Sequence, residues 1–193
     1  MPADGTVRVG EEGRLSFTLL HPDTVLHAAL ADAIRDHWAA VGVEVTLQAV
    51  PYSTLIEDYL ATHRYQVALV DFDLTRAYDP DPYPFWHQAE IVNGQNYAQW
   101  DNRSASEYLE QARVITEPDT RARLYRNFQV VFARELPALP LFYPVYTYAV
   151  DTRVLGVQVP LLFEPADRFN NIARWYLITR RALEQTQQAQ PTP

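Results

Sequence analysis

Residues 15–50 read LSFTLLHPDTVLHAALADAIRDHWAAVGVEVTLQAV, and this stretch predicts a strand, a helix and a second strand. The apolar run 15–20 predicts the first strand, which the polar segment 21–24 breaks. Apolar side chains then recur at steps of three and four residues as far as Gly42, a pattern typical of an amphipathic helix that a glycine closes. Residues 43–50 predict the second strand.

The next residues continue the same alternation. A shorter helix is predicted over 52–63 and a third strand over 65–71, and the strand is so continuously apolar that we expect it at the centre of the sheet. Strands and helices that alternate with short connections are typical of a mostly parallel sheet flanked by helices. The predicted fold class is therefore α/β, and ligands are expected at the C-terminal ends of the strands.

The composition excludes several classes of protein. The 193 residues are 48% hydrophobic and 21% charged, which is an ordinary globular balance. No apolar run approaches the roughly 18 to 20 residues that cross a bilayer. The formal net charge of −8 disfavours a nucleic-acid partner, and all sixteen basic residues are arginine. The absence of cysteine excludes a disulfide scaffold and thiolate-ligated metals.

A long connection over 72–103 follows the third strand. Its prolines, concentrated in residues 79–84, predict irregular backbone. A connection of this length in a compact domain is usually functional, and its many aromatic side chains argue against disorder. These side chains are Phe72, Tyr78, Tyr83, Phe85, Trp86, Tyr97 and Trp100. Such rings either pack among themselves or form the wall of a ligand site, and both interpretations stay open here.

The density of rings in this proline-broken segment also suggests where it lies. We expect residues 72–100 to cross the edge of the sheet at which the strands have their C-terminal ends. Tyr78, Trp86 and Trp100 should then be partly buried or face a cleft.

The remainder of the chain predicts two further helices, over 104–115 and 118–135. Segments 139–143 and 146–150 are strand-like. The predicted organisation is a flexible lead-in over 1–14, an α/β lobe over 15–144, a C-terminal segment over 145–181 and a disordered polar tail over 182–193.

Few residues suggest catalysis. Asp71 and Asp73 form an Asp-x-Asp pair, which in many glycosyltransferases holds a divalent ion against a nucleotide sugar, although such carboxylates also cap loops or pair with a residue such as Arg76. The five histidines lack zinc-ligand spacing and no Gly-x-Ser-x-Gly occurs, so no metal, cofactor or catalytic triad is predicted. His21 lies at a strand-to-helix turn, where ligands of such sheets bind.

Three stretches, taken in order, carry a resemblance to a known family. They are AIRDHWAAVGVEVTLQ (33–48), YDPDPY (78–83) with NYAQW (96–100), and RARLYRNFQ (121–129) running into LPALPLFY (136–143). From about residue 15 to about residue 178, the chain resembles the C-terminal part of the family 5 extracellular solute-binding proteins. These proteins are the dipeptide, oligopeptide and nickel receptors of ABC importers.

The resemblance implies a lobe of the type II periplasmic-binding-protein-like fold. It implies non-catalytic capture of a small polar solute, such as a peptide, an oligosaccharide or a metal chelate, by clamshell closure, and a membrane permease as partner. The family's full chain is much longer, with a signal peptide and an N-terminal lobe. We therefore expect Met1 to begin a fragment, the full-length protein to be periplasmic or lipid-anchored outside the cell, and residues 145–181 to lack the first lobe to which they normally return.

The resemblance also implies site residues. Peptide-binding members hold the ligand's α-ammonium with an aspartate four residues before the proline of the Asp-Pro pair, and Arg76 has that position here. A guanidinium suits a carboxylate or another acceptor-rich group, unless a neighbouring aspartate takes the ammonium-binding role. The residues expected to contact the solute are Arg76, Tyr78, Asp79, Trp86, Asn96, Trp100 and His21.

Two other functions stay open on the sequence. A metal-dependent, glycosyltransferase-like enzyme would use Asp71 and Asp73 and would need a bound divalent ion and turnover. A stand-alone interaction domain would bind another protein through exposed aromatic side chains. A solute receptor needs no metal, no cofactor and no catalysis.

Overall fold

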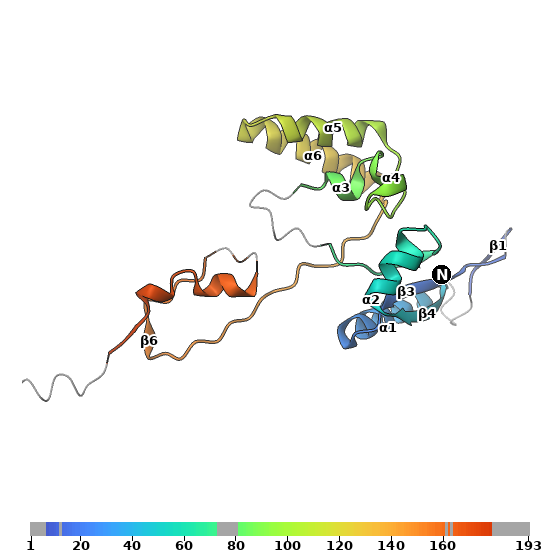
Figure 1. Ribbon diagram of the computed structural model, residues 1–193. Coiled ribbons are helices and arrows are strands. Elements are labelled where there is room, and N and C mark those ends of the chain that lie inside the picture. The colour runs from blue at the N-terminus through green and yellow to red at the C-terminus, as the bar shows by residue number, and fades with distance from the viewer. Residues whose placement is uncertain (1–6, 12, 73–80, 161, 163, 179–193) are drawn as a thin grey trace, which may run out of the picture. The chain divides into compact units, whose positions relative to one another are not determined.

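The computed structural model describes residues 7–11, 13–72, 81–160, 162 and 164–178 of the chain (Figure 1). The described residues as far as Leu139 form one compact unit, and those from Pro140 onward form a second. Each unit is described by itself.

Three parallel strands form the sheet of the first unit, in the order β4-β3-β5. β3 (Ser16–Pro22) pairs residue for residue with β4 (Glu44–Val50). β5 (Val67–Ala68) pairs with β3 at Leu19 and Leu20. The predicted parallel sheet is therefore confirmed.

The central position that we predicted for the third strand is wrong among the described strands. β3 occupies the centre, whereas β5 lies at an edge with only two paired residues. The apolar run that suggested a central strand has another cause. Leu69 packs into the core on one side of the sheet, and Val70 packs against the core on the other side. Both faces of this segment are covered although it has one strand neighbour.

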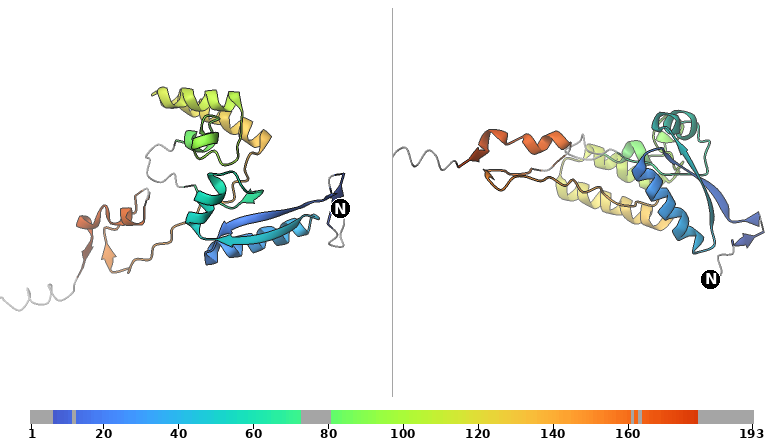
Figure 2. Two further views of the ribbon diagram at one scale, coloured as in Figure 1. Left: turned by 45° about the vertical axis from the view of Figure 1, so that its right-hand side comes forward. Right: turned by 90° about the horizontal axis from the view of Figure 1, so that it is seen from below.

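Helices cover both faces of the sheet. α1 (Val25–Ala39) lies on one face, and η1 (Leu55–Leu60), a π-helix that follows the short α2 (Tyr52–Thr54), lies on the other (Figure 2). Successive side chains of a strand point to opposite faces. Leu19 accordingly packs in the cluster beneath α1, and Leu20 packs in the cluster with η1.

Local sequence explains the bounds of α1. At its start, the side-chain oxygen of Thr24 accepts the backbone N–H of His27, which satisfies a donor that has no partner within the helix. Shortly after its end, Gly42 adopts a φ of 82°, in the left-handed region that favours glycine. The predicted glycine closure is confirmed.

Two one-turn helices, α3 (Tyr83–Trp86) and α4 (Glu90–Asn93), lie in the connection that follows the sheet. The prediction of irregular backbone is therefore wrong for residues 83–84. Pro84 stands in the first turn of α3, where the N–H that proline lacks would have no helical partner in any case.

α5 (Arg103–Val114) and α6 (Pro118–Glu135) form a helical hairpin and lie side by side in Figures 1 and 2. Both predicted helices are confirmed. A third apolar cluster includes Leu109 of α5 and Phe128 of α6 together with Trp100. Within the described ranges, no helix combines the length and the apolar character needed to cross a membrane.

The second unit has little regular structure. The strand-like segments 139–143 and 146–150 pair with no strand among the described residues, so that prediction is wrong for the chain as described. The strand residues present are β6 (Val154–Leu155) and β7 (Tyr176–Leu177), which pair antiparallel, and two 3-10 turns, η2 (Pro165–Phe169) and η3 (Ile172–Arg174), lie between them.

Within the predicted lead-in, β1 (Val9–Gly10) pairs antiparallel with β2 (Gly13–Arg14). The domain division that we predicted from the sequence stays a prediction.

Truncation of Leu55 should weaken the first unit strongly. This side chain has no exposed surface, so Leu55→Ala should lower the free energy of unfolding by about 2 to 5 kcal/mol through lost burial and a residual cavity. Val130→Ala, at a side chain that is 70% exposed, is the control and should change it by less than about 0.5 kcal/mol. Urea denaturation measures both. Equal losses in the two variants would contradict the assigned core.

Candidate functional site

A hollow of about 350 Å³ lies at the C-terminal edge of the parallel sheet. Two of the chain segments that line it follow strand ends, since Tyr52 comes just after β4 and Asp71 comes after β5. The other lining residues come from η1 and from the connection before α5. The described lining consists of Tyr52, Ile56, Asp71, Phe72, Phe85, Gln95 and Tyr97. This is the edge at which the sequence predicts a ligand.

Asp71 is held in place by a histidine from α1. Nε2 of His27 lies 3.0 Å from Oδ2 of Asp71, and because a carboxylate can only accept, Nε2 carries the proton and donates. On the other side of the ring, Nδ1 of His27 lies 2.7 Å from the hydroxyl oxygen of Thr24. The side chain of His27 is only 9% exposed, whereas that of Asp71 is 65% exposed. The carboxylate is therefore fixed in position but open to solvent.

Aromatic side chains supply most of the remaining wall. Burial, and then the negative charge of Asp71, raise the pKa of Tyr52, while burial raises the pKa of Tyr97. Both phenols are therefore neutral at physiological pH. Among the lining residues that the structure describes, Asp71 is the only one with a charged side chain. The hollow thus combines apolar rings with a single negative charge.

Trp86 and Trp100, which the sequence predicted as ligand contacts, lie in aromatic clusters. The ring centroid of Trp86 is 5.4 Å from that of Phe72 and 4.8 Å from that of Phe132, so Trp86 connects the wall of the hollow to α6. Trp100 is 8% exposed and donates its indole N–H to Glu135 at 2.8 Å. Its position is that of a core residue.

Asn96 has no exposed surface, and its amide is used by backbone groups. Nδ2 donates to the carbonyl oxygens of His87 at 3.1 Å and Trp100 at 2.9 Å, and Oδ1 accepts the backbone N–H of Trp100 at 3.1 Å. These bonds give Asn96 a structural role: it holds the two ends of the turn that contains α4.

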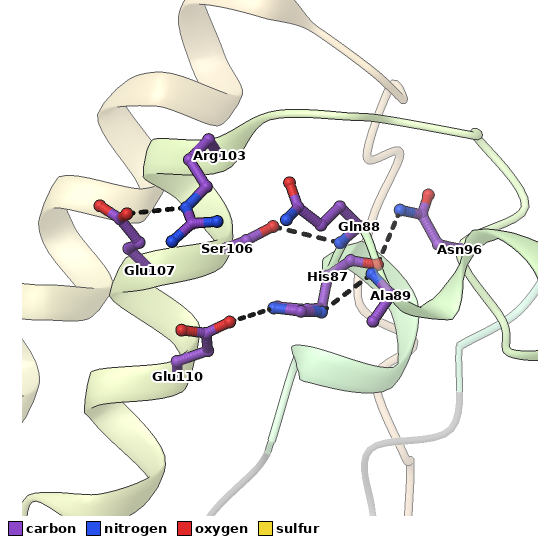
Figure 3. Close-up of polar contacts among 8 residues, drawn as sticks. All are labelled: His87, Gln88, Ala89, Asn96, Arg103, Ser106, Glu107 and Glu110. Carbon is purple, nitrogen blue, oxygen red and sulfur yellow. Dashed lines mark hydrogen bonds and ion pairs between the residues drawn. The ribbon is translucent and has the colours of Figure 1, made fainter.

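His87, which the sequence singled out for no particular function, fastens this connection to α5 (Figure 3). The buried ring donates from Nε2 to Glu110 at 2.9 Å, and its Nδ1 accepts the backbone N–H of Ala89 at 3.0 Å. The backbone N–H of Gln88 donates to the hydroxyl of Ser106 at 3.1 Å. The connection that forms one wall of the hollow is therefore attached to α5 by hydrogen bonds as well as by apolar packing.

The remaining predicted residues divide in two groups. His21 is 4% exposed at the end of β3, and its Nδ1 lies 2.9 Å from the carbonyl oxygen of Pro22. Arg76, Tyr78 and Asp79 lie outside the described residues, as does Asp73. The lining contains none of the four predicted residues that the structure describes. It does contain chain neighbours of two of them, namely Phe85 beside Trp86, and Gln95 and Tyr97 beside Asn96.

The described ranges bring no three potential metal-ligating side chains together. The carboxylate of Asp71, which an Asp-x-Asp enzyme would use, is bound by His27 here. The hollow is lined in part by Phe72, Phe85 and Tyr97, which the sequence identified only as aromatic residues of the connection. Nothing in the sequence pointed to the other lining residues Tyr52, Ile56 and Gln95.

No family model matches the chain. Oligopeptide-binding protein AppA of Bacillus subtilis is 24% identical over 166 residues, which are 85% of this chain and 30% of that protein. Oligopeptide-binding protein OppA of the same organism is 29% identical over 140 residues, which are 69% of this chain and 24% of that protein. The chain thus spans less than a third of the length of these curated relatives.

The likeness extends to the fold. The solved structure of AppA from Bacillus subtilis in complex with a nonapeptide matches with a TM-score of 0.69 at 23% identity, over 93% of this chain and 34% of that one. This confirms the predicted α/β lobe of the type II periplasmic binding proteins.

Removal of the Asn96 amide should destabilise the connection before α5. Asn96→Ala leaves two carbonyls and one N–H without their buried partner, so the free energy of unfolding should fall by about 2 to 4 kcal/mol. The control is Asn93→Ala, because Asn93 is exposed on α4. Chemical denaturation of both variants provides the comparison, and a small effect of Asn96→Ala would remove the structural role assigned to it.

The pKa of Glu135 should depend on Trp100. Hydrogen bonds from the indole N–H of Trp100, and then from Asn102, lower the pKa of Glu135 below its usual 4.5. The stabilisation from this carboxylate is therefore present above the unfolded-state pKa and is lost as the pH falls through the folded-state pKa. In Trp100→Phe, a carboxyl ¹³C titration by NMR should show the pKa of Glu135 shifted upward. An unchanged value would contradict the assigned bond.

Proposed function

We propose that this chain, which is a relative of the family 5 extracellular solute-binding proteins and has the fold of one of their lobes, serves as one lobe of a solute receptor for an ABC importer. The full-length receptor would work outside the cytoplasm and deliver its solute to a membrane permease. Most of its curated relatives are named oligopeptide- or dipeptide-binding proteins, although one is named a probable deoxycholate-binding protein. These names favour a peptide as solute and binding without catalysis.

One observation carries this proposal: the hollow lies where the parallel strands end, which is where open α/β sheets bind ligands. The hollow has concave walls of apolar rings and one polar group in a fixed position, which is the usual character of a small-molecule site. Arg76, Tyr78 and Asp79 remain proposed contacts from the segment that joins Phe72 to α3.

Closure by a second lobe would complete this half-site. Apolar side chains are exposed at the same edge of the sheet, including Val25 at 90% and Leu26 at 59% in the first turn of α1 and Phe72 at 37% in the wall. Exposed apolar groups around a concave site mark a surface that binds a partner. Hinged closure of two lobes would bury these groups and exclude water from the solute.

The second unit also has a surface that another lobe of the full-length receptor would cover. It exposes large apolar side chains, among which Tyr143 and Val145 are each 89% exposed. We propose that residues 145–181 pack against the first lobe of the full-length receptor, which would cover these exposed apolar side chains.

The proposal is tested by comparing this chain with the complete receptor that includes the first lobe. Titration calorimetry with di-, tri- and oligopeptides should give micromolar or tighter binding for the complete receptor. The isolated chain should bind at least about a hundredfold more weakly, because it lacks the second wall and the desolvation that closure provides. Micromolar binding by the isolated chain would contradict the single-lobe interpretation, and a complete receptor that binds no peptide would contradict the proposed solute.

A pair of variants in the complete receptor tests the position of the site. Tyr52→Ala removes a ring from the wall of the hollow and should weaken peptide binding about tenfold. Val92→Ala changes an exposed side chain on α4 that does not line the hollow, so affinity should be unchanged. Equal effects of the two changes would place the solute elsewhere.

A further inference from the structure

The chemistry of the hollow points to a particular kind of solute group. We propose that the hollow takes a positively charged group carried on an apolar stem, such as a lysyl or arginyl side chain, with the carboxylate of Asp71 as its anchor. This inference rests on the proposed solute-receptor function, and it names the chemical class of the solute.

The anchor is set in place before a solute arrives. His27 donates to one carboxylate oxygen of Asp71 at 3.0 Å and is itself held by the cap of α1 through Thr24 at 2.7 Å. Because 65% of the Asp71 side chain remains exposed, His27 orients the carboxylate without covering it. Because Asp71 is already ordered, binding of a cation here requires little further ordering of the protein, and its affinity is reduced little by that cost.

The walls around this carboxylate also suit a cation. The described lining has four aromatic side chains, from Tyr52, Phe72, Phe85 and Tyr97, and no arginine. The faces of aromatic rings attract ammonium and guanidinium groups, and this attraction adds to that of a nearby carboxylate. An anionic group should bind poorly here, because Asp71 repels it and no described lining residue has a positive charge to attract it.

The size of the hollow argues for a stem rather than a bare ammonium ion. A volume of about 350 Å³ is several times what one small ion needs, and the rings and Ile56 offer apolar surface that an apolar stem can cover but a bare ion cannot. A lysyl or arginyl side chain supplies both parts, since its stem packs on apolar surface while its charged end reaches a polar partner.

Nuclear magnetic resonance on this chain tests the inference directly, because millimolar binding to half a site is measurable. The chain, labelled with ¹⁵N, is titrated with Nα-acetyl-lysinamide, with Nα-acetyl-norleucinamide, which has the same stem without the charge, and with methylammonium, which has the charge without the stem. The lysine probe should shift amide signals of residues that line the hollow and should bind at least about fivefold more tightly than the other two.

A matched pair of variants assigns the effect to Asp71. Asp71→Asn keeps the shape of the side chain and removes its charge, so binding of the lysine probe should weaken at least about fivefold while that of the norleucine probe stays the same. Asp58→Asn removes the same charge from an exposed position on η1 outside the hollow and should change neither. Equal effects of the two variants would mean that only the net charge matters, which overturns the inference.

A further pair separates positioning by His27 from a merely structural role. His27→Phe should weaken the lysine probe, whereas His27→Gln, which retains an N–H donor, should restore part of that affinity. Thermal melting is recorded for both variants. If the loss of affinity for the lysine probe follows the fall in melting temperature and does not depend on whether residue 27 has an N–H donor, the proposed role of His27 is overturned.

The three-probe comparison uses the unaltered chain, so it decides the question even if a variant fails to fold. Equal binding of the lysine and norleucine probes, shifts away from the hollow or no shifts at all would each overturn the cationic assignment. The proposed receptor function has a separate readout. A complete receptor that binds neutral peptides while the lysine probe fails here would keep the receptor function and reject the cationic group.

Discussion

The parallel pairing of β3 with β4 is the constraint on which the first unit depends. Because the two strands run in the same direction and match residue for residue, both end at one edge, at Pro22 and Val50. At this edge, the hollow lies between the segment that follows β4, at Tyr52, and the segment that follows β5, at Asp71. The same pleat sends Leu19 and Leu20 to opposite faces, which lets α1 and η1 cover the sheet from both sides.

The aromatic connection before α5 serves two purposes, which its composition alone did not separate. Trp100 packs with α5 and α6, and Asn96 and His87 satisfy the polar backbone groups of the turns around it. Phe85 and Tyr97 instead line the hollow. A rigid wall results because the connection is fastened to a helical hairpin, so the rings on its open side keep their positions without a ligand to order them.

The hollow is open, as one half of a two-lobed site would be under the proposed function. A carboxylate that a buried imidazole orients stands against apolar rings, yet most of that carboxylate remains open, and apolar side chains beside it are exposed. The curated relatives are more than three times as long as the part of them that this chain matches. Under the proposed function, the exposed groups are the surface that a second lobe and a solute cover together.

The sequence by itself determined the alternation of strands and helices over residues 15–71, the parallel sheet and the helical pair near residues 104–135. It also predicted a ligand at the edge of the sheet where the hollow lies. Local periodicity and turn chemistry contain that information, because each depends on residues close in the chain. Only the tertiary structure decided that β3 is central, that Asn96 and Trp100 face inward and that the neighbours of Asn96 line the hollow. Those outcomes depend on contacts between residues distant in the chain, such as Trp100 and Glu135, which are 35 residues apart. A local sequence pattern does not indicate which side chains such contacts bury and which they leave facing a cavity.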